Sequence, residues 1–169
     1  MSLKHVLIYT DGACTGNPGP GGYGVVMIHG CHRKELSAGF RMTTNNRMEI
    51  WACIAALQAL KQQCEVTIYS DSRYVVDAMT KSWALNWRSR GWKRKESGSL
   101  KDALNADLWA QMLDLCDKHR VTFEWVRGHD GNEGNERCDE LARNAAGSDV
   151  LGIDTVYEAF RGKPLHAVT

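Results

Sequence analysis

The chain has 169 residues, of which 43% are hydrophobic and 24% charged, and this composition predicts one globular domain with a substantial core. No apolar run approaches the roughly 20 residues of a membrane span, and we expect no signal peptide. The six cysteines show no C-x-x-C spacing, so we expect reduced thiols and a cytoplasmic protein.

The net charge is only +1, which by itself argues against a polyanionic partner. The charge is unevenly distributed, however. Residues 81–101 contain seven Lys and Arg and one Glu, a net charge of +6, so the rest of the chain carries −5. This asymmetry predicts a local anion-binding surface.

The first predicted element is a buried strand over residues 6–12, an apolar and β-branched run that ends in Asp11 and a glycine. A carboxylate beside a core strand is costly unless a cation compensates for its lost hydration. Taken alone, Asp11 is more simply interpreted as a turn cap. A second β-rich run over residues 65–70 ends at Asp71, so the two acids predict one acidic site at neighbouring strand ends.

A glycine-rich turn over residues 14–22 follows the first strand. It lacks the Gly-Lys-Ser/Thr ending of a P-loop and precedes a strand, so we expect a hairpin loop and no nucleotide site. Two strands are predicted over 23–28 and 33–41. The His and Cys residues in the turn between them cannot easily converge on zinc, which favours a surface turn.

Residues 43–49 open a predicted helix that runs to about Gln62. Thr44, Asn45 or Asn46 could be its N-cap, and Asn46 with Glu49 has the character of a capping box. Alanines on one face would let this helix lie close to a sheet. For Glu49 alone, a capping or helix-dipole role is the simpler interpretation.

A short helix is predicted over residues 73–80, and a basic stretch over 81–95 follows it. Trp83 and Trp87 share a helical face, which alone would indicate core packing. The cations between them, and the Gly and Ser that follow, indicate a protruding element. Cations bind phosphates independently of sequence and Trp rings pack on sugars or bases, so we favour a nucleic-acid contact over a solvated face.

The last part of the predicted domain contains a helix over 105–119, a strand over 121–126 and a helix over about 136–146. The loop before the last helix contains His129. The last helix carries Asp139, for which a surface ion pair with Arg143 is the simpler interpretation. The tail from Gly147 has short apolar patches, and we expect at most weak docking from it.

Four acids therefore stand out: Asp11 and Asp71 at strand ends, and Glu49 and Asp139 on helices beside the sheet. Oxygen ligands without His or Cys indicate a hard cation, Mg²⁺ or Mn²⁺. Two such ions stabilise the attacking and leaving oxygens of a phosphoryl displacement. The basic element would then bind a polyanionic substrate.

Several long motifs resemble type 1 ribonuclease H of the bacterial type, in family order and over about residues 5–147. These motifs are residues 9–12 with 17–24, 43–49, 71–75, 86–87 with 90–93, 107–109, 125–129 and 135–142. The resemblance implies an α/β fold with a five-stranded mixed sheet, its first three strands antiparallel, and helices on both faces.

The resemblance also implies an activity: endonucleolytic hydrolysis of the RNA strand of RNA/DNA hybrids. Mg²⁺ would be the cofactor, with Mn²⁺ as a substitute, in a two-metal-ion reaction that leaves 3′-hydroxyl and 5′-phosphate ends. The implied catalytic domain is 1–147, with a basic protrusion at about 81–101, and the tail is 148–169. We expect a monomer with no obligate protein partner and no membrane contact.

The family's functional residues map onto matching positions. Asp11, Glu49, Asp71 and Asp139 would bind metal, and His129 would assist proton transfer or product departure. Asn17, Asn45 and Asn46 would read the minor groove, where the 2′-hydroxyl marks RNA. Thr44 and Asn105 resemble a pocket for a phosphate of the DNA strand. The protrusion would contribute Trp83, Trp87, Arg88, Arg90, Trp92, Lys93 and Arg94.

One departure affects the phosphate pocket, because Met42 replaces the basic residue often found two positions before Thr44, and Arg41 lies one position earlier. Two other interpretations remain open. A related polynucleotidyl transferase, such as an integrase or resolvase, would not need the basic tryptophan insertion or the loop histidine. A non-catalytic heteroduplex-binding module would be indicated by loss of a carboxylate, but all four are present.

Overall fold

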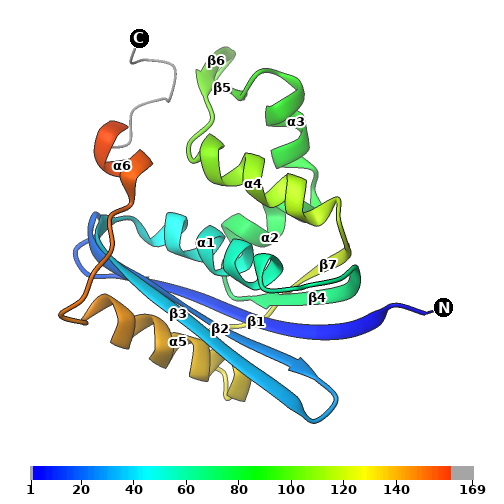
Figure 1. The fold of residues 1–169 in the computed structure, drawn as a ribbon. Coiled ribbons are helices and arrows are strands. Elements are labelled where there is room, and N and C mark those ends of the chain that lie inside the picture. The colour runs from blue at the N-terminus through cyan, green and yellow to red at the C-terminus, as the bar shows by residue number, and fades with distance from the viewer. Residues whose placement is uncertain (1, 161–169) are drawn as a thin grey trace.

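The structure is a computed structural model that describes residues 2–160 (Figure 1). The main sheet is built from β1 (Lys4–Cys14), β2 (Gly19–His29), β3 (His32–Thr43), β4 (Cys64–Ser70) and β7 (Arg120–Trp125). The helices are α1 (Asn45–Gln58), α2 (Arg73–Thr80), α3 (Trp83–Ser89), α4 (Ala106–Cys116), α5 (Glu133–Ala146) and α6 (Thr155–Phe160). A separate two-stranded sheet contains β5 (Lys93–Glu96) and β6 (Ser99–Asp102).

The main sheet has the strand order β3-β2-β1-β4-β7. The first three strands form an antiparallel meander, while β4 runs parallel to β1 and β7 runs parallel to β4. Helices α1, α2 and α4 lie on one side of this sheet and α5 lies on the other (Figure 1). The predicted mixed sheet with helices on both faces is therefore confirmed.

The core lies between the centre of the sheet and α1. Ile8, Val66 and Ile68 from the central strands are fully buried in the same core cluster as the apolar residues of this helix. Helix α1 is itself buried on most sides, because the sheet covers one side of it and α4 contacts it on another. Its apolar residues therefore do not form the single stripe expected of a surface helix.

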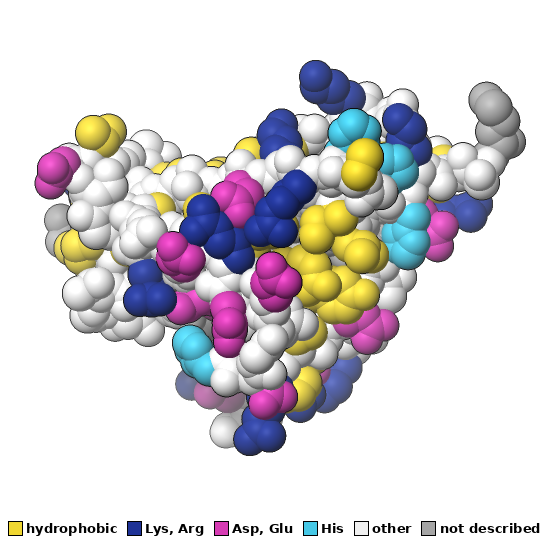
Figure 2. Space-filling model, turned by 90° about the horizontal axis from the view of Figure 1, so that it is seen from below, with side chains coloured by type: hydrophobic (Ala, Val, Ile, Leu, Met, Phe, Trp, Pro, Cys, Tyr) yellow, Lys and Arg dark blue, Asp and Glu magenta, His cyan; other side chains and the backbone are white. Residues whose placement is uncertain are grey.

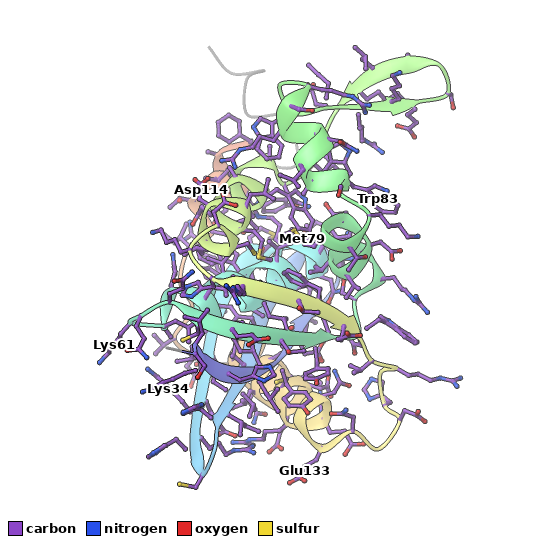
Figure 3. The ribbon with its side chains drawn as sticks, turned by 90° about the vertical axis from the view of Figure 1, so that its right-hand side faces the viewer. Lys34, Lys61, Met79, Trp83, Asp114 and Glu133 are labelled. Carbon is purple, nitrogen blue, oxygen red and sulfur yellow. The ribbon has the colours of Figure 1, made fainter. Side chains whose placement is uncertain are left out.

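Helix α3 and the β5–β6 hairpin form the protrusion, which extends beyond the α2 and α4 layer (Figures 1 and 3). The Trp87 ring packs against Trp109 of α4 with a centroid distance of 6.1 Å, whereas Trp83 is exposed. A protruding element was predicted here, but its hairpin was not, because four-residue strands composed largely of charged residues give no periodic signal.

Several predicted boundaries were wrong. Asp11 lies inside β1 and not at its end, because β2 continues through the glycine-rich segment and pairs with β1 as far as Cys14. Helix α1 ends at Gln58, four residues early, and α4 covers only residues 106–116. Helix α5 begins three residues early, because the Asn132 side chain caps it by accepting a hydrogen bond from the Asn135 N–H.

The described part of the tail, residues 148–160, contacts β3 and α1. Gly152 forms a bridge with Phe40, and Glu158 of α6 accepts hydrogen bonds from the exposed Arg41 guanidinium. Asp154 is buried, with 4% of its surface exposed. The division into a domain of residues 1–147 and a tail stays a prediction, and residues 161–169 lie outside the described part.

Among the described residues, no helix is long and apolar enough to cross a membrane. All six cysteines are free thiols, and Cys53, Cys64 and Cys138 are buried.

Candidate active site

Three of the four predicted acids converge: Asp11 from β1, Glu49 from the first turn of α1 and Asp71 immediately after β4. One carboxylate oxygen from each lies within 4.8 Å of the others. The register explains this, because Thr10 pairs with Ser70 across the parallel strands and places the two aspartates side by side. A Cβ at Gly12 would lie 2.6 Å from the Glu49 nitrogen, so only glycine lets α1 approach β1 this closely.

The three carboxylates are crowded, and those of Asp11 and Glu49 are buried away from water. Burial, followed by the charge of Asp71, raises the pKa of Asp11 to about 7. Burial and the charges of Asp11 and Asp71 raise the pKa of Glu49 well above its usual value. The Glu49 Oε2 atom is buried and accepts no hydrogen bond from the described residues. Such a buried oxygen, in a set of oxygen-only ligands, suits a hard divalent cation.

Asp139 is not part of this cluster. Its Oδ2 accepts a hydrogen bond of 2.9 Å from Nε of Arg143, one turn further along α5. Its charge still contributes to raising the pKa of Asp11, after burial and Asp71, so it lies close to the cluster. The structure thus brings together three of the four predicted ligands and places the fourth in the alternative ion pair.

A polar depression of about 440 Å³ lies beside the cluster. Asp139 and Arg143 line it together with Gly12 and Asn45, among other residues. The depression therefore connects the neighbourhood of the carboxylates with the start of α1, where the predicted minor-groove residues lie.

His129 lies in the loop between β7 and α5, where it is exposed and has a φ of 56°. The preceding Gly128 brings this loop against the cluster, since a Cβ there would lie 2.7 Å from Oδ2 of Asp71. The structure therefore places the His129 loop next to Asp71, although the imidazole is not among the three clustered side chains.

The predicted minor-groove residues lie where β2, β3 and α1 meet. Asn17 accepts a hydrogen bond of 3.0 Å from the Asn45 N–H through its Oδ1, which links the β1–β2 turn to α1. Thr44 is the N-cap, because its hydroxyl accepts from the Arg47 N–H at 3.2 Å. Asn46 is exposed in the first turn. Of the three predicted cap candidates, only Thr44 has this role.

A buried ionic network next to these residues was missed by the sequence reasoning. Arg47 donates two hydrogen bonds to Asp107 of α4, at 2.9 and 2.7 Å, and two to Asp154 of the tail, at 2.7 and 3.0 Å. Burial alone would lower the pKa of Arg47, but both carboxylates raise it. The available signal was an arginine at the start of a helix whose later residues are almost all apolar.

Asn105 is attached to this network. Its Oδ1 accepts a weak hydrogen bond of 3.4 Å from Nη1 of Arg47, and its Nδ2 donates to the Tyr74 hydroxyl at 3.2 Å. Asn105 has a left-handed backbone with a φ of 61°, a conformation that Asn tolerates better than most residues. Its side chain is therefore held by neighbours from two helices.

The cations of the protrusion are partly paired with acids. Arg88 contacts Asp114 at 2.6 Å, Lys93 contacts Asp102, and Arg94 contacts Glu96 at 3.1 Å. Asp102 directly follows residues 81–101 and Asp114 lies in α4, so the net charge of that stretch overstates the excess of positive charge around it. Trp92 is half-buried against the core. Of the residues predicted to bind nucleic acid from the protrusion, Trp83 and Arg90 are exposed.

The face of the molecule that carries α5 bears charges of both signs. On the face that carries α5, acidic and basic side chains are interspersed around a hydrophobic patch (Figure 2). Arg137 there pairs with Glu35 at 2.8 Å and with Glu140 at 3.0 Å.

The strand order, the helices on both faces and the buried carboxylates together define a ribonuclease H-like fold. The RNase H family model matches residues 3–147. The chain is 59% identical over 154 residues to a ribonuclease H of Syntrophus aciditrophicus, covering 91% of this chain and 87% of that protein. It is 58% identical over 156 residues to ribonuclease HI of Synechocystis, and this match covers 92% of this chain and 96% of that protein.

Solved structures agree. The crystal structure of LC9-RNase H1, a type 1 RNase H with the type 2 active-site motif, superposes with a TM-score of 0.76 at 34% identity, covering 96% of this chain and 83% of that one. LC11-RNase H1 in complex with RNA/DNA hybrid has a TM-score of 0.63 at 29% identity, covering 83% and 96%. The chain belongs to the RNase H family, and it is an enzyme of the endoribonuclease hydrolase class.

Proposed function

We propose that this protein hydrolyses the RNA strand of RNA/DNA hybrids, with Mg²⁺, or Mn²⁺ in its place, held by Asp11, Glu49, Asp71 and Asp139. The observation that carries the proposal is the cluster of three carboxylates, two of them buried, in which one Glu49 oxygen accepts no hydrogen bond from the described residues. Repelling charges of this kind are unfavourable in a fold unless a cation joins them. LC11-RNase H1, a family member, has been crystallised with the same class of substrate.

The reaction we propose is a two-metal-ion hydrolysis that leaves 3′-hydroxyl and 5′-phosphate ends. When bound, the two cations supply charge stabilisation to the attacking and leaving oxygens of the phosphoryl displacement. Asp11 and Glu49 must lose the protons that their raised pKa values favour before they can act as ligands. His129, on the loop beside Asp71, would accept or relay a proton that the ligated carboxylates cannot take.

Substrate recognition is proposed for the surface between the depression and the protrusion. Asn17, Asn45 and Asn46 would contact the minor groove, and the Asn17–Asn45 hydrogen bond would fix their relative positions. Thr44 and Asn105 would contact a phosphate of the DNA strand. Met42 contributes no cation to this pocket. The protrusion would bind the backbone through Trp83, Trp87, Arg88, Arg90, Trp92, Lys93 and Arg94.

We further propose that the protein acts in the cytoplasm as a monomer without an obligate protein partner, and that residues 1–147 form the catalytic domain. The complete set of acids argues against the alternative of a non-catalytic heteroduplex-binding module. The basic protrusion and the loop histidine favour a ribonuclease H over an integrase-like or resolvase-like transferase.

A cleavage assay on four substrates tests this proposal. Strand-labelled RNA/DNA hybrid, double-stranded RNA, single-stranded RNA and duplex DNA would each be incubated with the protein and Mg²⁺. We expect cleavage of the RNA strand of the hybrid, with 5′-phosphate ends, no cleavage in EDTA, and none by Asp71→Asn. Cleavage of the hybrid's DNA strand, or of duplex DNA, would contradict the proposal.

A further inference from the structure

Asp139 forms an ion pair with Arg143 in the structure, and it is also the fourth acid proposed to bind metal with the three-carboxylate cluster. The proposed function requires Asp139 to join Asp11, Glu49 and Asp71, yet in the structure its Oδ2 is bound by Nε of Arg143 at 2.9 Å. The guanidinium holds the Asp139 side chain in its present position, so we expect this ion pair to oppose a turn of the carboxylate towards a cation in the cluster.

Arg143 is exposed and lines the depression, so its guanidinium can reach other ligands if Asp139 turns away. Its side chain is 65% exposed, against 18% for Asp139, and both residues line the depression that also includes Gly12 and Asn45. A guanidinium released from Asp139 would therefore remain in the depression, at the edge of the surface proposed for the hybrid, where it could bind a phosphate.

We propose that Arg143 is a positioning residue that exchanges partners. It holds Asp139 out of the cluster while no cation is bound there, and it passes to a phosphate of the nucleic acid when Asp139 turns to the metal. The proposal rests on the proposed function, because it requires a cation at the carboxylates and a polyanion in the groove.

Electrostatic interactions favour Asp139 paired with Arg143 when no cation is bound, and Asp139 in the cluster when a divalent cation is bound. Without a cation, moving the Asp139 carboxylate into the cluster would add negative charge beside acids that already disfavour one another's ionisation. With a divalent cation present, that charge becomes favourable. Exposed i,i+4 ion pairs are weak, so Arg143 should reduce the affinity for an Asp139-dependent cation by only about two- to fivefold.

Calorimetric titration of Mn²⁺ into the metal-free full-length protein tests the first half of the exchange. We expect Arg143→Gln to tighten cation binding by about two- to fivefold. The gain should vanish when the same change is made in an Asp139→Asn background. Arg137→Gln is the matched control, because Arg137 lies on the same helix, has the same charge, and pairs with Glu35 and Glu140.

Three calorimetric results would overturn the exchange: equal gains in Arg143→Gln and Arg137→Gln, a gain that persists without Asp139, or no gain at all. Asp11→Asn separates this failure from failure of the proposed function. If Asp11→Asn abolishes cation binding while Arg143→Gln changes nothing, only the exchange is wrong. If Asp11→Asn has no effect, the proposed metal site is wrong, and the exchange is wrong with it.

Salt dependence of hybrid binding tests the second half. In EDTA, Arg143→Gln and the wild type should show the same slope of log affinity against log salt, because Arg143 is engaged by Asp139. With Mg²⁺, the slope of log(1/KM) should be shallower for the variant by about one unit. A slope difference that is the same with and without Mg²⁺, or absent in both, would contradict release of Arg143.

Discussion

Asp154→Ala removes one carboxylate from the buried network that joins the tail to α1. Asp154 accepts hydrogen bonds from Arg47 at 2.7 and 3.0 Å, from the Thr43 hydroxyl at 2.7 Å and from the Tyr157 N–H at 3.3 Å. The side chains of Arg47 and Asp154 are 4% and 3% exposed, so water cannot easily replace the lost partner.

The expected loss of stability is about 3 kcal/mol. Breaking a buried ion pair by removing one partner typically costs about 3–5 kcal/mol, because it leaves an uncompensated charge. Here Arg47 keeps both of its hydrogen bonds to Asp107, which places the loss at the lower end of that range. For a protein of this size, about 3 kcal/mol corresponds to a fall in Tm of roughly 6–12 °C.

Urea and thermal unfolding of the full-length protein would measure this loss. Glu158→Ala is the control, because it removes another tail contact, but one to the exposed Arg41, and should cost less than about 1 kcal/mol. A loss below about 1 kcal/mol for Asp154→Ala would refute the view that the network is buried and tightly coupled. Equal losses in both variants would show that detachment of the tail, and not the charge of Arg47, is responsible.

Three further predictions concern the site. In EDTA the free energy of unfolding should fall as pH rises from about 4 to about 7, because folded Asp11 and Glu49 keep protons that the unfolded chain releases near pH 4. A free energy of unfolding that does not change with pH in EDTA, or that falls equally with saturating Mg²⁺, would contradict this. Neutralising Arg88, Arg90, Lys93 and Arg94 together should raise KM and flatten the salt dependence of hybrid binding, with kcat changed far less. Because three of these cations are paired with acids, the slope of log affinity against log salt should fall by less than about four. A collapse of kcat with an unchanged slope would contradict a binding role. His129→Ala should lower kcat by about 10²–10⁴-fold or somewhat less, with KM and Mg²⁺ affinity nearly unchanged. Its residual rate should exceed that of Asp71→Asn. A wild-type kcat in this variant, with product release controlled by pre-steady-state kinetics, would exclude the histidine from the mechanism.

Local patterns predicted the buried strands and the convergence of Asp11 and Asp71, whereas the arrangement of the strands in one mixed sheet was implied by the family resemblance. Buried strands carry a strong periodic signal, and two strands that end in acids imply one site when they are parallel neighbours. The exact end of β1 was not predictable in this way. It depends on pairing with the glycine-rich start of β2, which is a tertiary interaction between segments that look like a loop in sequence.

Contacts over long sequence distances account for most of what was missed. Arg47 binds Asp154, which is 107 positions away in a segment with no motif, so neither residue indicates the other. Asp139 shows a different limit. Its i,i+4 spacing from Arg143 predicted the ion pair, and its place in the family motif predicted a metal ligand, but the sequence cannot rank two partners for one carboxylate.

In the proposed function, Asp11, Glu49 and Asp71 are held together for metal-dependent chemistry and not for stability. The most direct measurement is cleavage of an RNA/DNA hybrid by Asp71→Asn in Mg²⁺, combined with the Tm of the same metal-free protein. We predict that activity is abolished while Tm is equal to or above that of the wild type, because the variant removes the Asp71 charge, which is unfavourable beside Asp11 and Glu49. Retained cleavage, or a large fall in Tm, would contradict the account.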